Sequence, residues 1–269
     1  MNFKLVLFSF LFFSNSFSQG PIDGFFKSKN ELDLAASASY SSAPKYFAGT
    51  KLIDYPRNQS IVSLYGNYGL SKRWNLIVSL PLINFKPQDI ALYGKFKLIA
   101  KRFKKSEWSV FPSFGVSVPT WKYETQSGQA IGQRAVQFQP ILVTQFKWDK
   151  GLFVQAQTHY NYVLQPVPSS FNASFKIGFA GNKFYYDVWF DYQNGFGDKD
   201  YQGTVSFDSF RELVTSYQRV GGVAYYTINS KLGTFINGSY TFSGRNMSQS
   251  LNIGAGIVFK LKTGKKAKS

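Results

Sequence analysis

Long segments of strict polar–apolar alternation constrain this chain more than any other feature. Within residues 89–119, two segments (89–101 and 108–118) alternate residue by residue around a basic turn. A period of two places one face of a β-strand against an apolar medium and the other against a polar one. Each segment exceeds the ~5–6 residues typical of soluble strands and matches the ~9–11 residues of a tilted strand that crosses a membrane.

The same pattern recurs along the chain and predicts twelve strands. They are residues 31–40, 60–70, 74–83, 89–101, 108–118, 134–148, 152–164, 169–180, 184–193, 212–228, 231–243 and 249–261. Tight turns alternate with longer loops, as in outer-membrane barrels. The predicted fold is therefore all-β, a transmembrane antiparallel β-barrel of about 12 strands in up-and-down order, closed because no backbone group can face lipid unpaired. A soluble β-sandwich, with shorter strands, is the alternative. Gly221 and Gly222 mark an expected bulge or kink.

The first 18 residues are predicted to be a signal peptide. Lys4 precedes an apolar run at 5–13 and a small-x-small cleavage site at 16–18, which leaves Gln19 first in the mature chain. The run is shorter than the ~20 residues of a membrane-spanning helix. A periplasmic N-terminal segment at 19–30, irregular and placed at the barrel entrance, a barrel at 31–261 and a basic tail at 262–269 follow. The expected location is the bacterial outer membrane.

Composition supports export and removes several chemistries. The chain has no cysteine, which excludes disulfides, zinc–cysteine sites, thiol nucleophiles and lipid attachment. Aromatic residues make up 19% of the sequence, and those near strand ends are expected to form the girdles at the two membrane interfaces. These girdle candidates are Tyr40, Tyr68, Trp74, Trp108, Trp148, Tyr162 and Tyr192.

The basic excess has three interpretations. The formal net charge is +17, and many of the cations fall in turns. Attraction to lipopolysaccharide and outer-membrane lipid headgroups is one explanation, and a cationic lumen that favours anions is a second. The third is that turn lysines only solvate the strand ends. Nucleic-acid binding is disfavoured, because the cations are scattered and the chain is exported.

The polar faces of the strands supply the candidate pore-lining residues. They are Lys95, Lys97, Gln137, Gln139, Gln155, Gln157, His159, Lys176, Asp187 and Asp191. A twelve-strand interior is wider than the side-chain-filled lumen of eight strands and narrower than a sixteen-strand porin. It can therefore pass a small solute, or long lysine and glutamine side chains can occlude it. By contrast, Arg102, Lys104 and Lys105 belong to a periplasmic turn.

No catalytic constellation is present in the sequence. His159 is the sole histidine, and Asn161 occupies the position where an outer-membrane phospholipase would carry its serine. Asp187 and Asp191 are about 13 Å apart along a strand, too far for a paired-carboxylate site, and are expected to pair with lumen cations. Three loop aspartates (Asp198, Asp200 and Asp208) form only a weak calcium pattern. No cofactor, metal or catalytic residue is predicted.

A family resemblance is carried by DIALYGKFKLIAKR, SEWSVFPSFGVSVPT and FVQAQTHYNYV, and by the opening GFFKSKNELDLAASASYSSAPKYFAG. This arrangement resembles the phenol-degradation meta-pathway outer-membrane proteins, in their Bacteroidetes form, which are related to hydrophobic-compound uptake barrels. The resemblance implies a barrel that takes up small hydrophobic compounds. Two features depart from the family. Trp121 follows Pro119-Thr120 where the family often has Gly, and we expect no N-terminal segment long enough to form a lumen hatch.

Three functions are consistent with these observations. The first is an outer-membrane channel for passive uptake of small, hydrophobic or anionic compounds. The second is a structural or adhesive outer-membrane barrel with an occluded lumen, in which the loops at 41–59 and 194–210 carry the function. The third is an outer-membrane lipid-modifying enzyme, which lacks a visible nucleophile and base. The expected partners are outer-membrane lipid, lipopolysaccharide and a small-molecule solute.

Overall fold

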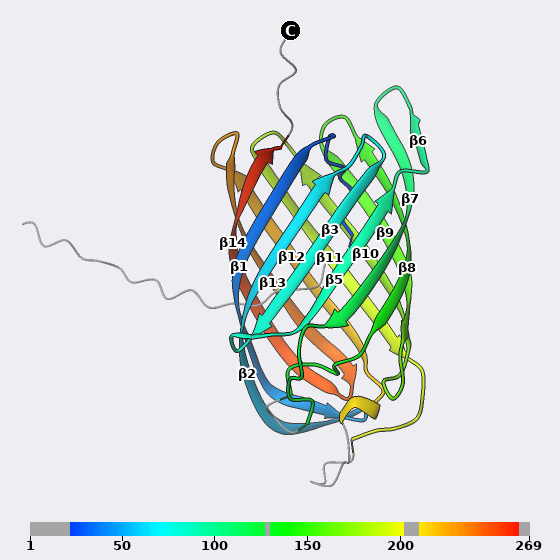
Figure 1. The fold of residues 1–269 in the computed structure, drawn as a ribbon, viewed down its shortest axis with the longest axis vertical. Coiled ribbons are helices and arrows are strands. Elements are labelled where there is room, and N and C mark those ends of the chain that lie inside the picture. The colour runs from blue at the N-terminus through cyan, green and yellow to red at the C-terminus, as the bar shows by residue number, and fades with distance from the viewer. Residues whose placement is uncertain (1–21, 127–129, 202–209, 264–269) are drawn as a thin grey trace, which may run out of the picture.

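The strands of the chain close into a single barrel (Figure 1). The structure, a computed structural model, describes residues 22–126, 130–201 and 210–263. Twelve strands form an antiparallel ring in up-and-down order, and two short pieces, β4 and β6, are appended to it. The ring closes where β1 pairs with β14, from Glu31 opposite Lys262 to Phe47 opposite Met247. The predicted fold class is confirmed.

The described elements follow in chain order. They are β1 (Glu31–Ala48), β2 (Lys51–Gly69), β3 (Trp74–Ile83), β4 (Lys86–Pro87), β5 (Asp89–Phe96), β6 (Ile99–Arg102), β7 (Ser106–Pro119), β8 (Gln137–Trp148), β9 (Leu152–Val163), β10 (Ser170–Ala180), β11 (Phe184–Gly195), the 3₁₀ turn η2 (Phe210–Glu212), β12 (Ser216–Thr227), β13 (Leu232–Arg245) and β14 (Met247–Lys262). Among the described residues, no helix is both long and apolar enough to cross a membrane. The predicted signal peptide and the end of the basic tail lie outside the described residues.

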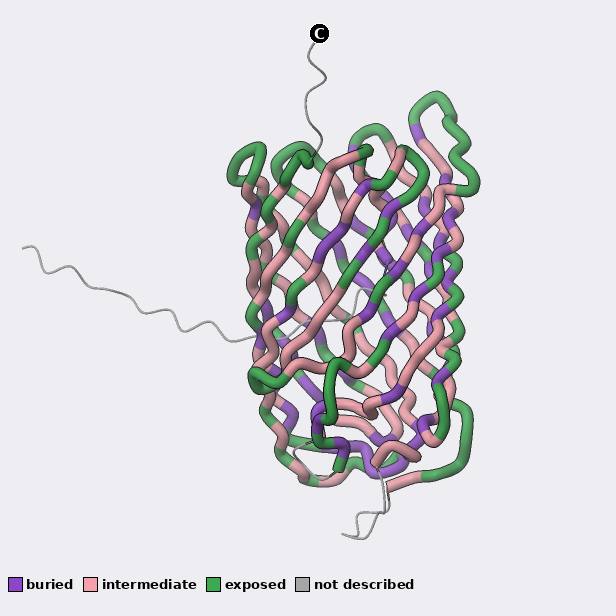
Figure 2. The backbone as a smooth tube through the Cα atoms, in the orientation of Figure 1, coloured by how far each residue is buried: buried purple, intermediate pink, exposed green. Residues whose placement is uncertain are grey.

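The outward face of the ring is apolar. Ile236, Val188 and Ile253 are 64%, 60% and 58% exposed, and exposed and less exposed positions alternate along the strands (Figure 2). The outward residues predicted for the last strand are confirmed at Leu251 and Phe259, which are also exposed. A closed strand ring with an apolar outer face meets the requirements of a bilayer. The protein is therefore a bacterial outer-membrane β-barrel.

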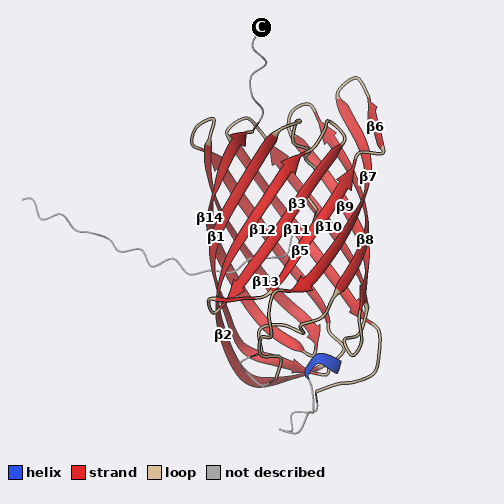
Figure 3. Cartoon of the chain, in the orientation of Figure 1, coloured by secondary structure: helices blue, strands red, loops and turns tan. Residues whose placement is uncertain are grey.

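The two ends of the barrel differ. Short turns join β8 to β9, β10 to β11 and β12 to β13 at the end where the described chain begins and ends, and Thr263 there donates to the carbonyl of Asn30 at 2.8 Å. Longer segments at 120–136 and 196–215 lie at the opposite end, together with η2 (Figure 3). Short turns and termini mark the periplasmic end of such barrels, and long loops mark the outer end.

The first two strands extend further than the sequence predicted. Residues 41–59 were expected to form a polar loop, but β1 and β2 pair through them as far as Ala48 opposite Lys51. Pro44 and Pro56 both lie at a register shift, where Ala43 pairs with Arg57 but Lys45 pairs with Asp54. A bulge accommodates a proline because the residues within it need not donate to the ladder.

The hairpin at 89–119 is interrupted where the sequence predicted a continuous strand. The first strand ends at Phe96, opposite Trp74 of β3, and resumes at Ile99 as β6, which pairs only with β7. The β6–β7 ribbon therefore projects beyond the neighbouring turns at the periplasmic end (Figure 1). The chain has no further strand on the β3 side at this height, so the ribbon is left with one partner.

The fold also revises the expectation for strand 212–228. This strand begins at Ser216, because Phe210–Glu212 form the 3₁₀ turn. The register shift lies between Gln218 and Arg219, whereas Gly221 and Gly222 pair regularly with β13. A Cβ on Gly221 would lie 2.1 Å from the Trp189 ring. That glycine therefore makes room for an inward tryptophan.

Candidate functional site

An apolar patch interrupts the polar lining of the lumen at its periplasmic half. Ile77 on β3, Phe111 on β7, and Ile141 and Val143 on β8 all point inward and are at most 4% exposed. Inward side chains of a barrel this wide do not meet one another across the lumen. An apolar patch facing the lumen therefore requires another part of the chain to cover it.

Residues 22–26, which we call the strap, cover this patch from inside the barrel. Ile22 is fully buried within the apolar cluster. The ring of Phe26 meets Phe111 edge-on at 5.3 Å between centroids. Phe25 meets Phe153 in the same way at 5.3 Å. The strap thus occupies the lumen, whereas the sequence placed residues 19–30 at the periplasmic entrance and predicted no hatch.

A buried ammonium group ties the strap to the wall. Lys95, which is 0% exposed, donates from Nζ to Oδ1 of Asp23 at 2.9 Å, to the Asp23 carbonyl at 3.0 Å and to the Phe25 carbonyl at 2.6 Å. These contacts use all three donors of the ammonium. A buried charge is tolerated when it is paired and hydrogen-bonded in this way.

Further polar groups on the wall hold the strap backbone. Gln145 donates to the Gly24 carbonyl at 3.3 Å, and Gln155 donates to the Ile22 carbonyl at 3.2 Å. The ammonium of Lys97 lies 4.6 Å from the centre of the Phe26 ring. Three of the predicted pore-lining residues, Lys95, Lys97 and Gln155, therefore contact the strap. The sequence signal for this arrangement was the presence of Ile22, Phe25 and Phe26 in an otherwise Gly- and Lys-rich segment.

Ion pairs cross three neighbouring strands on the other side of the lumen. Lys176 of β10 lies 3.3 Å from Asp187 of β11, and Arg219 of β12 lies 3.6 Å from Asp191 of β11. All four side chains are at most 16% exposed. Both aspartates therefore pair with lumen cations, as the sequence predicted. The pairs leave little excess charge on this wall.

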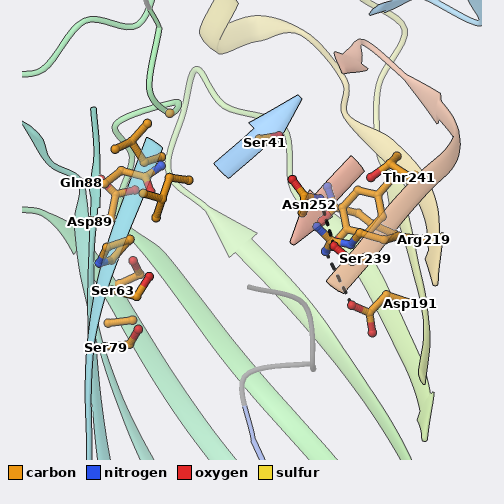
Figure 4. Close-up of a pocket in the computed structure, with 18 of the residues that line it drawn as sticks. Ser41, Ser63, Ser79, Gln88, Asp89, Asp191, Arg219, Ser239, Thr241 and Asn252 are labelled. Atoms are coloured by element: carbon orange, nitrogen blue, oxygen red, sulfur yellow. Dashed lines mark hydrogen bonds and ion pairs between the residues drawn. The ribbon is translucent and has the colours of Figure 1, made fainter. Parts of the chain in front are cut away.

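A cavity of about 1050 Å³ extends from the strap to the loops at the outer end. Figure 4 shows its two facing walls. One carries Ser63, Ser79, Gln88 and Asp89, and the other carries Asp191, Arg219, Ser239, Thr241 and Asn252. Small hydroxyl and amide side chains on β13 and β14 thus account for much of the lining, and sequence reasoning passed over them because it selected long or charged residues.

Four of the ten predicted pore-lining residues line this cavity. They are Gln137, Gln139, His159 and Asp191. Gln157 is buried on β9 opposite Ser174. Lys176 and Asp187 are buried in their ion pair. Contact of any of these residues with a solute stays a prediction.

His159 faces the cavity from β9. Its register partner on β10 is Asn172, and its Nδ1 atom makes no hydrogen bond with the residues that the structure describes. In the same part of the chain, no group of three or more histidine or acidic side chains is arranged to hold a metal ion.

A polar clasp joins the loops at the outer end. Arg245 grips both carboxylate oxygens of Asp200 at 2.6 and 3.0 Å. Asn246 accepts from the Gly49 amide at 2.9 Å and donates to the Val214 carbonyl at 2.7 Å. Hydrogen bonds from Arg245 hold the pKa of Asp200 below its usual 3.8. Asp200, a candidate calcium ligand from the sequence, is thus engaged by protein, while Asp208 lies outside the described residues.

The two long loops also contact each other. Arg211 donates to the carbonyls of Gln133 at 2.9 Å and Arg134 at 3.1 Å, which links the described parts of 196–215 and 120–136. The hydroxyl of Tyr123 donates to Asp89 and accepts from the Arg134 amide at 2.8 Å. The outer mouth of the cavity is therefore bordered by loops that are fastened to the wall and to one another.

Comparison with known proteins places the barrel among solved outer-membrane proteins. No protein-family model matches the chain, and no curated protein matches it significantly. The COG4313 outer membrane channel from Pseudomonas putida F1 is similar, with TM-score 0.68 and 10% identity over 91% of this chain and 100% of that one. The NanC porin has TM-score 0.56 and 13% identity over 86% of this chain and 100% of its own. The chain therefore shares the fold of outer-membrane channel and porin barrels.

Proposed function

We propose that the protein is an outer-membrane channel through which small solutes enter passively. The observation that carries this proposal is the cavity of about 1050 Å³, which lies inside the ring between the outer loops and the strap. Hydroxyl, amide and charged side chains border it, so water and polar solutes are accommodated without a large desolvation penalty. The titles of the two similar structures, an outer membrane channel and a porin, support the same role.

The proposed solutes are small, hydrophobic or anionic compounds. The resemblance to phenol-degradation barrels supports hydrophobic ones. The apolar side chains that line the cavity among its polar groups, including Ile61, Ile83 and Phe235, support the same class. The +17 formal charge supports attraction of anions to the barrel. No energy coupling is proposed.

The strap favours a second candidate function. Residues 22–26 fill the lumen beside Lys95 and Phe111, so a barrel that keeps the strap seated is occluded. Such a barrel has a structural or adhesive role. Under the channel proposal, solute passes when the strap leaves this seat.

Planar-bilayer conductance of the purified protein tests the channel proposal. We expect discrete conductance steps and swelling of liposomes in a series of small neutral and anionic solutes, with a cut-off at increasing solute size. The absence of conductance steps together with the absence of swelling for every solute would establish the occluded barrel instead. Empty liposomes and liposomes with a closed eight-strand barrel serve as controls.

A further inference from the structure

A cluster of aromatic rings and one arginine lies at the outer end of the cavity. The outer ends of β1 and β2 curve across the barrel end (Figure 1). They carry Tyr46, Tyr55 and Arg57, all of which line the cavity together with Phe210 of η2. Tyr201 stands behind Tyr46. None of these residues was among the sequence-predicted pore-lining residues, because residues 41–59 were expected to form a loop.

The bulge in β1 determines which side chains of the cluster face inward. Before it, odd-numbered positions such as Ser41 and Ala43 line the cavity, and after it Tyr46 does. Without the one-residue shift, the alternation would turn Lys45 inward and Tyr46 outward. The two prolines at the shift therefore place a tyrosine, rather than a lysine, beside Arg57.

The four rings form a continuous apolar surface. Tyr46 meets Tyr55 at 5.9 Å and Tyr201 at 5.8 Å between centroids, with interplanar angles of 62° and 89°. Tyr201 stacks on Phe210 at 5.4 Å with an angle of 30°. Tyr46 itself is 7% exposed. Edge-to-face and stacked contacts of this kind hold rings rigidly and leave ring faces for a ligand.

Arg57 differs from the other arginines of the lumen and outer mouth because it has no acidic partner among the described residues. Arg219 pairs with Asp191, and Arg245 pairs with Asp200. The Nε atom of Arg57 is shielded from solvent and has no hydrogen-bond partner. The titratable groups that influence it are the phenols of Tyr46 and Tyr55. A partly buried guanidinium presents a rigid fork of donors that matches a carboxylate.

We propose that Arg57 and the rings of Tyr46, Tyr55 and Phe210 form a binding subsite for a small organic carboxylate that carries a planar ring. The carboxylate accepts hydrogen bonds from the guanidinium, and the ring packs on the aromatic surface. A single guanidinium matches a monoanion, and an inorganic anion would leave the rings unused. The inference rests on the proposed channel function and specifies the class of solute that the channel selects.

Calorimetric titration of the purified barrel with benzoate tests the subsite. We expect benzoate to bind more tightly than acetate, which lacks the ring, and than benzyl alcohol, which lacks the charge. Arg57→Gln is expected to weaken benzoate binding about tenfold or more and to leave benzyl alcohol binding unchanged. Arg57→Lys keeps the charge without the fork and is expected to give an intermediate loss. Arg102→Gln, at the opposite end of the barrel, is the matched control and is expected to bind benzoate as the unmodified protein does.

The outcomes separate this inference from the channel proposal. Absence of benzoate binding, equal affinity for acetate, or an Arg57→Gln variant that binds as tightly as the unmodified protein would each overturn the subsite, whatever the conductance. Arg57-dependent benzoate binding in a protein without conductance would overturn the channel and keep the subsite. Heat-dependent migration on gels verifies that each variant is a folded barrel before titration. If Arg57→Gln does not fold, the comparison of Arg57→Lys with Arg102→Gln decides.

Discussion

The two halves of the lumen are built from the same strands but are filled in different ways. On β7, Phe111 faces inward near the periplasmic end and Ser117 faces inward near the outer end. On β5, Lys95 and Asp89 show the same division. The periplasmic half is closed by a strap from the same chain, and the outer half retains a cavity. A barrel wall can therefore encode closed and open sections through the size and polarity of its inward side chains alone.

The strap is held by a small balance of large terms. Ordering five backbone residues costs about 5–10 kcal/mol. Burial of Ile22, Phe25 and Phe26 against the wall returns at most about 9 kcal/mol, because a large apolar side chain contributes about 1.5–3 kcal/mol. The two terms nearly cancel. The contacts of Lys95 with Asp23 and with the strap carbonyls therefore decide whether the strap stays seated.

The largest effect is expected when this buried pair is broken. Asp23→Ala leaves the ammonium of Lys95 without its carboxylate, and removal of one partner from a buried pair costs about 3–5 kcal/mol. That loss exceeds the net stability of the strap seat, so we expect the strap to leave the lumen while the ring stays closed. Hydrogen exchange at residues 22–30 should rise by orders of magnitude, and conductance in planar bilayers should increase.

The control for this experiment is the same substitution in an exposed pair. Asp149→Ala removes the partner of Arg102 at the periplasmic end, where the two side chains are 40% and 61% exposed. Exchange at the strap and conductance should both stay at the levels of the unmodified protein. Unchanged exchange protection in Asp23→Ala would contradict the role assigned to Lys95.

A smaller effect is expected at the outer clasp. Arg245→Gln removes the grip on Asp200, in which the side chains are 26% and 32% exposed. Solvent screening limits the contribution of such a pair to about 1 kcal/mol, so we expect the loops to loosen without loss of the barrel. Because the chain has no cysteine, spin labels on Lys122→Cys and Asp198→Cys report the distance between the two loops. That distance distribution should broaden in Arg245→Gln and stay unchanged in Arg73→Gln, which alters an exposed arginine at the other end.

The clasp also has a defined pH dependence. The hydrogen bonds of Arg245 lower the pKa of Asp200 below 3.8 in the folded protein. The contribution of the clasp is therefore complete above the ordinary pKa of an aspartate and is lost as pH falls through the lowered value. The spin-label distribution should be constant from neutral pH down to about 4 and should broaden only in more acidic solution. Broadening between pH 5 and 7 would assign the transition to another group.

The sequence predicted the ring well because the bilayer imposes period-two alternation on every strand. The outward residues Leu76 and Val78 of β3, like those of β14, were recognised from this pattern alone. The predicted strand ends fell within a few residues in most cases, since turns such as Asp149-Lys150-Gly151 are strongly marked. Local rules therefore sufficed wherever the environment of a residue was lipid on one side and lumen on the other.

The interior was predicted less well because its contacts are not local. Nothing near Asp23 in the sequence indicates a partner 72 residues away in Lys95. The prolines at 44 and 56 indicated a loop, and only the pairing of both within one bulge keeps the strands continuous. Arg57 was missed for that reason. Site residues that depend on a register shift or on a strap from elsewhere in the chain require the three-dimensional structure.

The smallest effect is expected at the exposed pair of the projecting ribbon, and it tests whether burial, rather than charge pairing itself, distinguishes the two regions. Arg102 and Asp149 are 2.6 Å apart at the end of β6, a strand with a single neighbour. Ion pairs in water contribute about 0–1 kcal/mol and weaken with salt. Arg102→Ala should therefore change the midpoint of thermal unfolding in detergent by no more than a few degrees, and the difference should vanish in high salt. A loss as large as that of Asp23→Ala would mean that the ribbon supports the ring, and that a charge pair needs no burial to hold this barrel together.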